Sequence, residues 1–190
     1  KEKIMYINKP PMGWNSWNTF GWDINEKVIC DMADKIVELG LKDVGYEYVV
    51  IDDCWSLRER GADGRIVADP EKFPHGMKYI ADKIHAKGYK AGIWLAPFSA
   101  QVSSIIAKEH PDWLIKHENG KPMVGCLAWG GAYTFDIYNE EVRAYLKKVF
   151  DVVLNEWGYD MVKLDFLYSE CVIPRNGKCR GEIMYDAMSL

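Results

Sequence analysis

The chain has 190 residues and a formal net charge of −4, so it has no electrostatic basis for binding nucleic acid or an anionic membrane surface. Its 48 % apolar and 27 % charged residues are ordinary for a soluble globular protein, and its length suits one domain with a sizeable core. The 8 Trp and 11 Tyr are unusual, and such an excess suits either a core or the stacking of flat rings on a sugar.

In chain order, the sequence first predicts a strand over 12–17, a helix over 25–43 and a strand over 46–53. A loop and helix over 68–88, a strand over 89–97 and an irregular stretch over 101–136 follow. The last predicted elements are a helix over 139–158, a strand over 159–166 and a helix that begins at 181 and continues to 190. The first long helix has apolar residues at helical spacing, as at Val28, Met32 and Ile36, whereas the later strands are nearly continuous apolar runs. The irregular stretch is expected to contain a short helix near 101–109 and a hairpin around 117–122.

Strands that are buried on both faces and joined by helices imply a parallel sheet, either doubly wound or part of a (β/α)8 barrel. The first strand–helix turn has no GxGxxG motif, which argues against the nucleotide-binding open sheet. A complete barrel has about 250 residues, and this chain has room for about four strand–helix units. The sequence therefore predicts an α/β fold in which residues 1–190 form one domain, the first half of a TIM barrel.

Polar and aromatic side chains collect at the carboxyl ends of all the predicted strands, where a barrel has its active site. They are Asn15, Trp17, Asp52, Asp53, Trp94, Pro97, Lys163 and Asp165. In MVKLDF (161–166), Lys163 and Asp165 stand two residues apart in a strand and so point to the same face. Because a buried ion pair is weak evidence for stability, a functional role for this pair competes with a structural one.

The segment IDDCW (51–55) ends the second strand with Asp52 and Asp53. If the strand continues, the two side chains point to opposite faces, but if it turns, both reach one pocket and can accept hydrogen bonds from ligand hydroxyls. The structural alternative is an Asx turn or a helix cap, and no further ligand stands at a metal-binding spacing. Trp17 likewise is either a core side chain or a stacking wall for a sugar.

Two other carboxylates are weaker candidates for a catalytic role. Asp136 precedes the helix over 139–158, and capping of that helix, with Asn139 as the better cap, explains most of the pattern. Glu170 lies five residues beyond Asp165, but the direction of its side chain does not follow from the sequence.

The cysteines are Cys30, Cys54, Cys126, Cys171 and Cys179. Their odd number and the absence of a CxxC pair indicate neither a full disulfide framework nor a zinc site. The first eleven residues contain no secretory apolar segment, and no apolar run is long enough to span a bilayer. We therefore expect a cytoplasmic protein that does not associate with membranes.

Four segments together resemble a known family: PPMGWNSWN (10–18), YEYVVIDDCW (46–55), DPEKFPHGMKYIADKIHAKGYKAGIW (69–94) and MVKLDF (161–166). In this order they are similar to α-galactosidases of glycoside hydrolase families 27 and 36, and the resemblance covers nearly the whole chain. The early segments are more similar to family 27, whereas the stretch that begins APFSAQVSSIIAKEHPDWL (96–114) is more similar to family 36.

The resemblance implies a (β/α)8 barrel that hydrolyses terminal α-D-galactosides with retention of configuration and needs no metal or organic cofactor. By motif match, Asp165 would be the nucleophile, and Lys163 would bind ring hydroxyls and keep Asp165 ionised. The paired Asp52 and Asp53 would hold sugar hydroxyls, and Trp17 would line the same pocket. Galactose or an α-galactoside is therefore the implied ligand.

Further sugar contacts are expected from two other places in the chain. Trp94 stands at the carboxyl end of the third predicted strand. The segment GCLAWGGAY (125–133) would shape the pocket beside it, with Cys126 and Trp129 as its candidate contacts.

The resemblance is incomplete in one respect. The family's acid/base is an aspartate after the sixth strand, which has no counterpart here, so the isolated chain is expected to be inactive. One alternative is a non-catalytic sugar-binding or scaffold half-barrel, and another is an unrelated barrel enzyme such as a sugar-phosphate isomerase. A half-barrel also exposes sheet edges, which predicts a homodimer or pairing with the missing barrel half.

Overall fold

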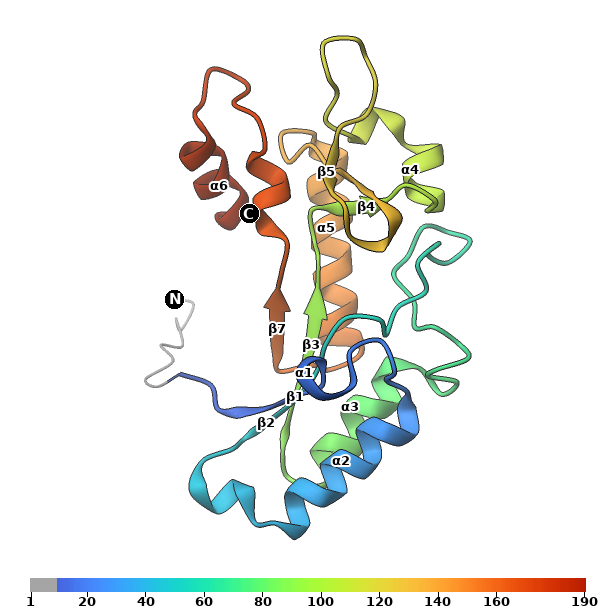
Figure 1. The fold of residues 1–190 in the computed structure, drawn as a ribbon, viewed down its shortest axis with the longest axis vertical. Helices are drawn as coiled ribbons and strands as arrows, with labels where there is room; N and C mark the ends of the chain where they lie inside the picture. The colour runs from blue at the N-terminus through green and yellow to red at the C-terminus, as the bar shows by residue number, and fades with distance from the viewer. Residues whose placement is uncertain (1–9) are drawn as a thin grey trace.

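The computed structural model describes residues 10–190, so most of the segment considered for a secretory signal lies outside the described residues (Figure 1). Within this part, a four-stranded parallel sheet has the order β1-β2-β3-β7. Its strands are β1 (Gly13–Asn15), β2 (Tyr48–Ile51), β3 (Lys90–Leu95) and β7 (Met161–Leu164). The predicted parallel α/β fold is confirmed, and the open sheet with β1 and β7 at its edges is consistent with half of a barrel.

The helices, in chain order, are α1 (Trp17–Phe20), α2 (Glu26–Glu38), η1 (Leu41–Val44), α3 (Gly76–Ala86), α4 (Ile105–Glu109), η2 (Pro111–Trp113), η3 (Ala128–Gly130), α5 (Glu140–Asp151), η4 (Val152–Glu156), η5 (Leu167–Cys171) and α6 (Arg180–Met188). Two of the long helices begin at capping asparagines. Asn25 Oδ1 accepts a hydrogen bond from the Val28 N–H at 2.9 Å, and Asn139 Oδ1 accepts one from the Glu141 N–H at 2.8 Å. The cap predicted at Asn139 is thus confirmed.

Some element boundaries differ from the prediction. The first strand ends early because Asn15 Oδ1 accepts a hydrogen bond from the Trp17 N–H at 2.9 Å, and the chain turns into α1 there. The helix predicted over 25–43 stops at Glu38, and Gly40, with φ of 64°, separates it from η1. The last helix ends at Met188 instead of continuing to 190.

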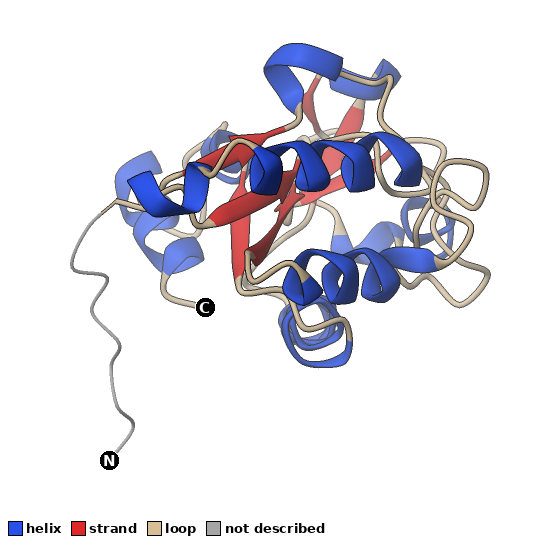
Figure 2. Ribbon diagram, turned by 90° about the horizontal axis from the view of Figure 1, so that it is seen from below, coloured by secondary structure: helices blue, strands red, loops and turns tan. Residues whose placement is uncertain are grey.

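The main core lies between the sheet and the helices that pack on one of its faces. Figure 2 shows the strands in the middle of the molecule with helices around them. Val49 and Ile51 of β2, Ile93 of β3, Ile80 of α3 and Ile29 of α2 are all fully buried in this core. Since side chains alternate along a strand, the residues between them face the other side of the sheet.

The stretch predicted to be irregular contains a second sheet. Its antiparallel strands are β4 (Ser99–Gln101), β5 (Val124–Cys126) and β6 (Ala132–Thr134), in the order β4-β6-β5. The predicted short helix is confirmed as α4, and the predicted hairpin is confirmed by a bridge between Lys116 and Pro122. A second core that includes Phe98 and Phe135 packs this sheet against α5, beyond the carboxyl end of β3 (Figure 1).

Two absences apply to the described residues. None of the helices within residues 10–190 is long and apolar enough to cross a membrane. The five cysteines, all of which the structure describes, are free thiols. Disulfides therefore make no contribution to the described fold.

Candidate active site

A cavity with a volume of about 380 Å³ lies at the carboxyl ends of the parallel strands. Its lining residues are Trp17, Trp22, Asp52, Asp53, Cys54, Arg58, Trp94, Ala128, Trp129, Lys163, Asp165 and Phe166. The parallel register pairs Trp94 with Lys163, so these two side chains leave the same face of the sheet. The polar side chains that the sequence places at this end of the sheet therefore line one cavity.

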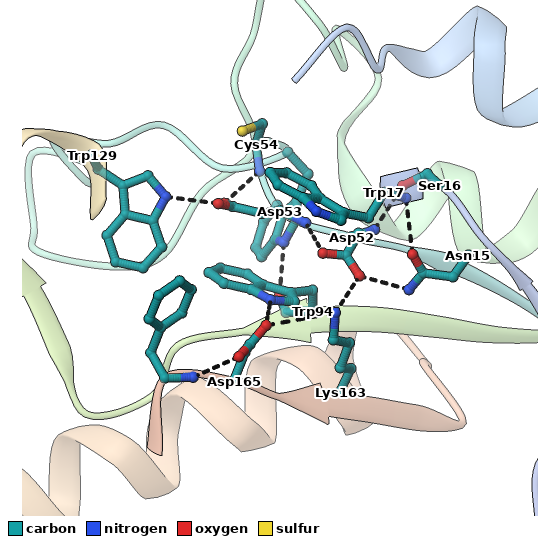
Figure 3. Close-up of polar contacts among 12 residues, drawn as sticks. Asn15, Ser16, Trp17, Asp52, Asp53, Cys54, Trp94, Trp129, Lys163 and Asp165 are labelled. Atoms are coloured by element: carbon teal, nitrogen blue, oxygen red, sulfur yellow. Dashed lines mark hydrogen bonds and ion pairs between the residues drawn. The ribbon is translucent and has the colours of Figure 1, made fainter. Parts of the chain in front are cut away.

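Asp52 is the buried centre of the polar network drawn in Figure 3. Only 2 % of Asp52 is exposed, and its Oδ2 accepts hydrogen bonds from Asn15 Nδ2 at 2.6 Å and Lys163 Nζ at 2.8 Å. The Asp53 N–H donates to Asp52 Oδ1 at 2.9 Å, and the Asp52 N–H donates to Ser16 Oγ at 2.9 Å. A buried carboxylate with this many donors is fixed in position.

Asp165 lies on the other side of Lys163 and is more open to the cavity, with 40 % of its side chain exposed. Its Oδ2 accepts a hydrogen bond from Trp94 Nε1 at 3.0 Å and lies 3.6 Å from Lys163 Nζ, while its Oδ1 accepts one from the Phe166 N–H at 2.8 Å. Partial burial alone would raise the pKa of Asp165, but these hydrogen bonds and the Lys163 charge outweigh it and leave the pKa below its ordinary value. Asp165 is therefore an ionised carboxylate that faces the cavity.

Asp53 points away from Asp52 and toward the antiparallel sheet (Figure 3). Its Oδ2 accepts a hydrogen bond from Trp129 Nε1 at 2.7 Å and its Oδ1 accepts one from the Cys54 N–H at 2.6 Å. Burial raises the pKa of Asp53, although these two hydrogen bonds oppose the shift. Because β2 ends at Ile51, both aspartates line one cavity, as expected if the strand turns.

Three non-glycine residues of this cavity have left-handed backbone conformations. They are Cys54 with φ of 73°, Trp129 with φ of 57° and Phe166 with φ of 53°. Such conformations are unfavourable for these residues and persist where the surrounding contacts determine the backbone. These three residues lie next to Asp53 and Asp165 or contact them. Their strained backbone conformations therefore indicate that the surrounding contacts fix the side chains at the cavity.

Aromatic rings form one wall of the cavity. The ring centroids of Trp129 and Phe166 are 4.9 Å apart, and that of Trp94 lies 5.8 Å from Trp129 and 6.2 Å from Phe166. Trp17 and Trp22 remain 40 % and 67 % exposed at the same cavity. Carboxylate acceptors, one ammonium donor and flat apolar rings together suit a small ligand that carries several hydroxyl groups.

The structure brings together most of the residues that the sequence singled out, whereas the two weaker carboxylate candidates, Asp136 and Glu170, lie outside the cavity. Trp17, Asp52, Asp53, Trp94, Lys163 and Asp165 all line the cavity. Cys126 does not line it; this thiol is buried, and its sulfur accepts a hydrogen bond from the Ala128 N–H at 3.3 Å. The sequence reasoning missed Trp22, Arg58 and Phe166; Phe166 directly follows Asp165, which was the one available signal.

Metal binding has no support in the described part of the chain. Residues 10–190 contain no group of three or more His, Cys, Asp or Glu side chains that could hold a metal ion. The carboxylates of the cavity are instead bonded to Lys163, to Asn15, to tryptophan rings and to backbone N–H groups. These donors suit carboxylates that receive hydroxyl groups or attack carbon.

Replacing Lys163 by methionine is expected to raise the pKa of Asp165, because the Lys163 charge and hydrogen bond hold it down. The free energy of unfolding should also fall by about 1–2 kcal/mol, since Asp52 loses a charged donor. Carbon-13 NMR titration of the aspartate carboxyls and urea unfolding measure the two effects. Lys90→Met is the matched control, because Lys90 lies at the opposite end of the sheet; a pKa of Asp165 that is the same in both variants would contradict the proposed coupling.

The comparisons with known sequences all point to one group of proteins. A family model described as alpha galactosidase A matches residues 9–104. A probable alpha-galactosidase B from Aspergillus clavatus is 44 % identical over 142 residues, which are 66 % of this chain and 31 % of the relative. The alpha-galactosidase of Saccharomyces pastorianus is 52 % identical over 85 residues, which are 45 % of this chain and 18 % of the relative.

Solved structures agree over nearly the whole chain. The alpha-galactosidase of Thermus thermophilus, in complex with p-nitrophenyl α-D-galactopyranoside, superposes with a TM-score of 0.80 at 31 % identity and covers 96 % of this chain. Alpha-galactosidase I from Mortierella vinacea has a TM-score of 0.60 at 33 % identity over 95 % of this chain. The match covers 35 % and 37 % of those two chains, so the present chain spans about a third of their length.

Proposed function

This chain belongs to the alpha-galactosidase A family, and from that premise we propose that it carries the nucleophile and part of the sugar pocket of a retaining hydrolase of terminal α-D-galactosides. Its structure is a partial (β/α) barrel like that of its structural neighbours. The observation that carries the proposal is the ionised Asp165, held by Trp94 and Lys163 at the carboxyl end of β7 and open to a cavity with two further carboxylates.

In the proposed mechanism, Asp165 attacks the anomeric carbon of a bound galactoside and forms a covalent glycosyl ester, while the bond to the leaving oxygen breaks. A carboxylate whose pKa is lowered stays ionised in mildly acidic solution and is therefore available as a nucleophile. The Trp94 N–H and Lys163 orient the attacking oxygen toward the cavity.

The same cavity offers groups that would hold the sugar. Asp52 and Asp53 present carboxylate oxygens to neighbouring hydroxyls, and Lys163 bridges Asp52 and Asp165 so that its ammonium reaches both sides of the ligand. Trp17, which remains 40 % exposed, supplies apolar ring surface for the CH face of galactose. Several of the structural neighbours have been solved with galactosides, including stachyose and raffinose, which supports this ligand class.

Hydrolysis with retention also needs a second carboxyl group that donates a proton to the leaving oxygen. Asp53 has a raised pKa, but both of its oxygens already accept hydrogen bonds from Trp129 and Cys54, so it is arranged as an acceptor. We therefore expect the isolated chain to act poorly on substrates whose leaving group needs protonation. The proton donor would come from a part of the barrel beyond these residues.

The first experiment is hydrolysis of p-nitrophenyl α-D-galactopyranoside by the 190-residue chain, with intact-mass detection of a hexosyl adduct. An aryl leaving group needs little proton donation, so slow turnover or a trapped adduct is the expected result. Binding of galactose without either product would favour the second candidate, a non-catalytic sugar-binding half-barrel. The third alternative, an unrelated sugar-phosphate isomerase, is overturned by the family match.

Self-association is expected for the isolated chain, because within residues 10–190 β1 and β7 each pair on one side only. Beside the edge of β7, a groove of about 870 Å³ is lined by apolar side chains, among them Phe98, Phe150, Leu164 and Met188, together with charged ones. Either the missing barrel half or a second copy would cover this surface. Sedimentation velocity should show dimers that increase with concentration and diminish in Leu164→Lys, and a monomer at all concentrations would contradict the expectation.

A further inference from the structure

Glu170 is a fully buried carboxyl group in η5, the short helix that follows Asp165. Its Oε1 is bonded to Arg175 Nη2, and its backbone carbonyl accepts a hydrogen bond from Arg175 Nη1 at 2.6 Å. The Arg175 side chain is only 11 % exposed. One guanidinium thus binds both the side chain and the main chain of Glu170 and closes the loop between η5 and α6.

The same pair of residues attaches η5 to the chain that follows β6. Burial raises the pKa of the Glu170 carboxyl group and the Ile137 backbone amide opposes that shift, while Asp136 Oδ1 lies 3.7 Å from Arg175 Nε. Thr134 Oγ1 of β6 donates to the Ser169 carbonyl at 3.2 Å. These contacts fix η5 against the end of the antiparallel sheet.

That sheet also positions the far wall of the cavity. Trp129 lies in the loop between β5 and β6, and its carbonyl accepts a hydrogen bond from Gln101 Nε2 of β4 at 2.8 Å. Its ring contacts Phe166 and its indole N–H binds Asp53. A shift of η5 against the sheet would therefore move Asp165 relative to Trp129 and Asp53.

We propose that Glu170 and Arg175 are positioning residues, a buried clamp that keeps the loop of Asp165 in register with the loop of Trp129. The proposal rests on the proposed function, because it assigns the clamp to the galactoside site. The two residues touch neither the cavity nor its ligand, and they act through η5 and β6.

A purely stabilising role fits the arrangement less well. Buried contacts between a carboxyl group and a guanidinium are commonly no more stabilising than apolar side chains of similar size. Glu170 Oε2 and Arg175 Nε are buried without a hydrogen-bond partner among the described residues, and Asp136 adds a second negative charge. A leucine would fill the same space without the free-energy cost of burying a polar group. The presence of Glu170 there therefore indicates a role for its directional contacts with Arg175.

The test combines hydrogen–deuterium exchange of the whole 190-residue chain with binding of 1-deoxygalactonojirimycin, a ligand of a structural neighbour. The variants are Glu170→Ala and Arg175→Met, with Glu170→Gln as the conservative change and Val153→Ala, in the main core, as the matched destabilised control. The clamp predicts that segments 161–171 and 124–134 lose protection together in the first two variants. Affinity for the ligand should fall about tenfold to a hundredfold, and Glu170→Gln should restore most of it.

The two readouts separate the clamp from the proposed function. If the unmodified chain does not bind the ligand, the proposed galactoside site is wrong, and the linked loss of protection in the two segments still decides whether the clamp exists. If Glu170→Ala loosens only 161–171, or alters exchange and affinity no more than Val153→Ala does, the clamp is overturned.

Discussion

Turnover of p-nitrophenyl α-D-galactopyranoside is expected to fall at least about 10³-fold in Asp165→Asn, because the amide cannot form the glycosyl ester. The effect should appear in the rate of nitrophenolate release and in the loss of any hexosyl adduct. Galactose binding should weaken far less, since Asp52, Asp53 and the aromatic wall are unchanged. Both carboxylate oxygens of Asp165 accept hydrogen bonds, whereas the asparagine replaces one of them with an N–H₂ group that cannot accept. The free energy of unfolding should therefore fall by about 1–2 kcal/mol.

Asp160→Asn is the control for this variant. Asp160 precedes the same strand at its opposite end, where its Oδ2 is bonded to His85 Nε2 at 2.8 Å and accepts a hydrogen bond from the Ala91 N–H at 2.8 Å. The substitution should lower stability and leave turnover intact, because functional groups of a barrel gather at the carboxyl ends of its strands. Equal loss of turnover in both variants would show that Asp165 acts through stability, and undiminished turnover in Asp165→Asn would remove it as the nucleophile.

Much of the parallel sheet could be predicted because its strands are apolar on both faces and are separated by helices with clear periodicity. The positions of side chains then follow from strand geometry alone. Lys163 and Asp165 share a face because they are two residues apart, and the carboxyl ends of parallel strands lie together. This is why most of the residues assigned to the site line one cavity. The exception, Cys126, lies in a three-residue strand, where no pattern fixes which face a side chain takes.

The antiparallel sheet could not be predicted because it depends on contacts distant in sequence. Each of its strands has three residues, too few for alternation to be visible, and Gly125 is in one of them. A Cβ atom at Gly125 would lie 1.9 Å from Thr134 Oγ1, so the glycine is required by close packing that only the folded chain reveals. The same limit applies to Trp129, whose bond to Asp53 joins residues 76 positions apart.

Glu170 shows the limit most clearly. Its position five residues after Asp165 indicated proximity, but a single buried carboxyl group in an irregular segment has no periodic signature. Its environment is set by Arg175 from one side and by Ile137 from the other, and both come from loops. The physical consequence of that environment is a measurable change in the pH dependence of stability.

Glu170→Gln is expected to remove a fall in stability between pH 4.5 and about 8. Burial raises the pKa of Glu170 from 4.5 to about 8, although the Arg175 charge opposes the shift. In this window the folded chain keeps a proton on Glu170 that the unfolded chain releases, so the free energy of unfolding falls by up to about 1.4 kcal/mol per pH unit as the pH rises. Above pH 8 both states are ionised and the contribution is constant.

Thermal unfolding between about pH 5 and 9 measures this slope, which corresponds to about 3–5 °C per pH unit at most for a chain of this size. Arg175 and Asp136 are the charged groups that face Glu170. Glu182→Gln is the control: Glu182 is exposed, its pKa is lowered by the Cys179 N–H, and its contribution is lost only in acid. The melting temperature of Glu170→Gln should therefore rise relative to that of the unmodified chain as the pH rises. The melting temperature of Glu182→Gln should differ from that of the unmodified chain by a constant amount over the same range. A slope that persists in Glu170→Gln would assign the titration to another group and contradict a protonated Glu170 in the clamp.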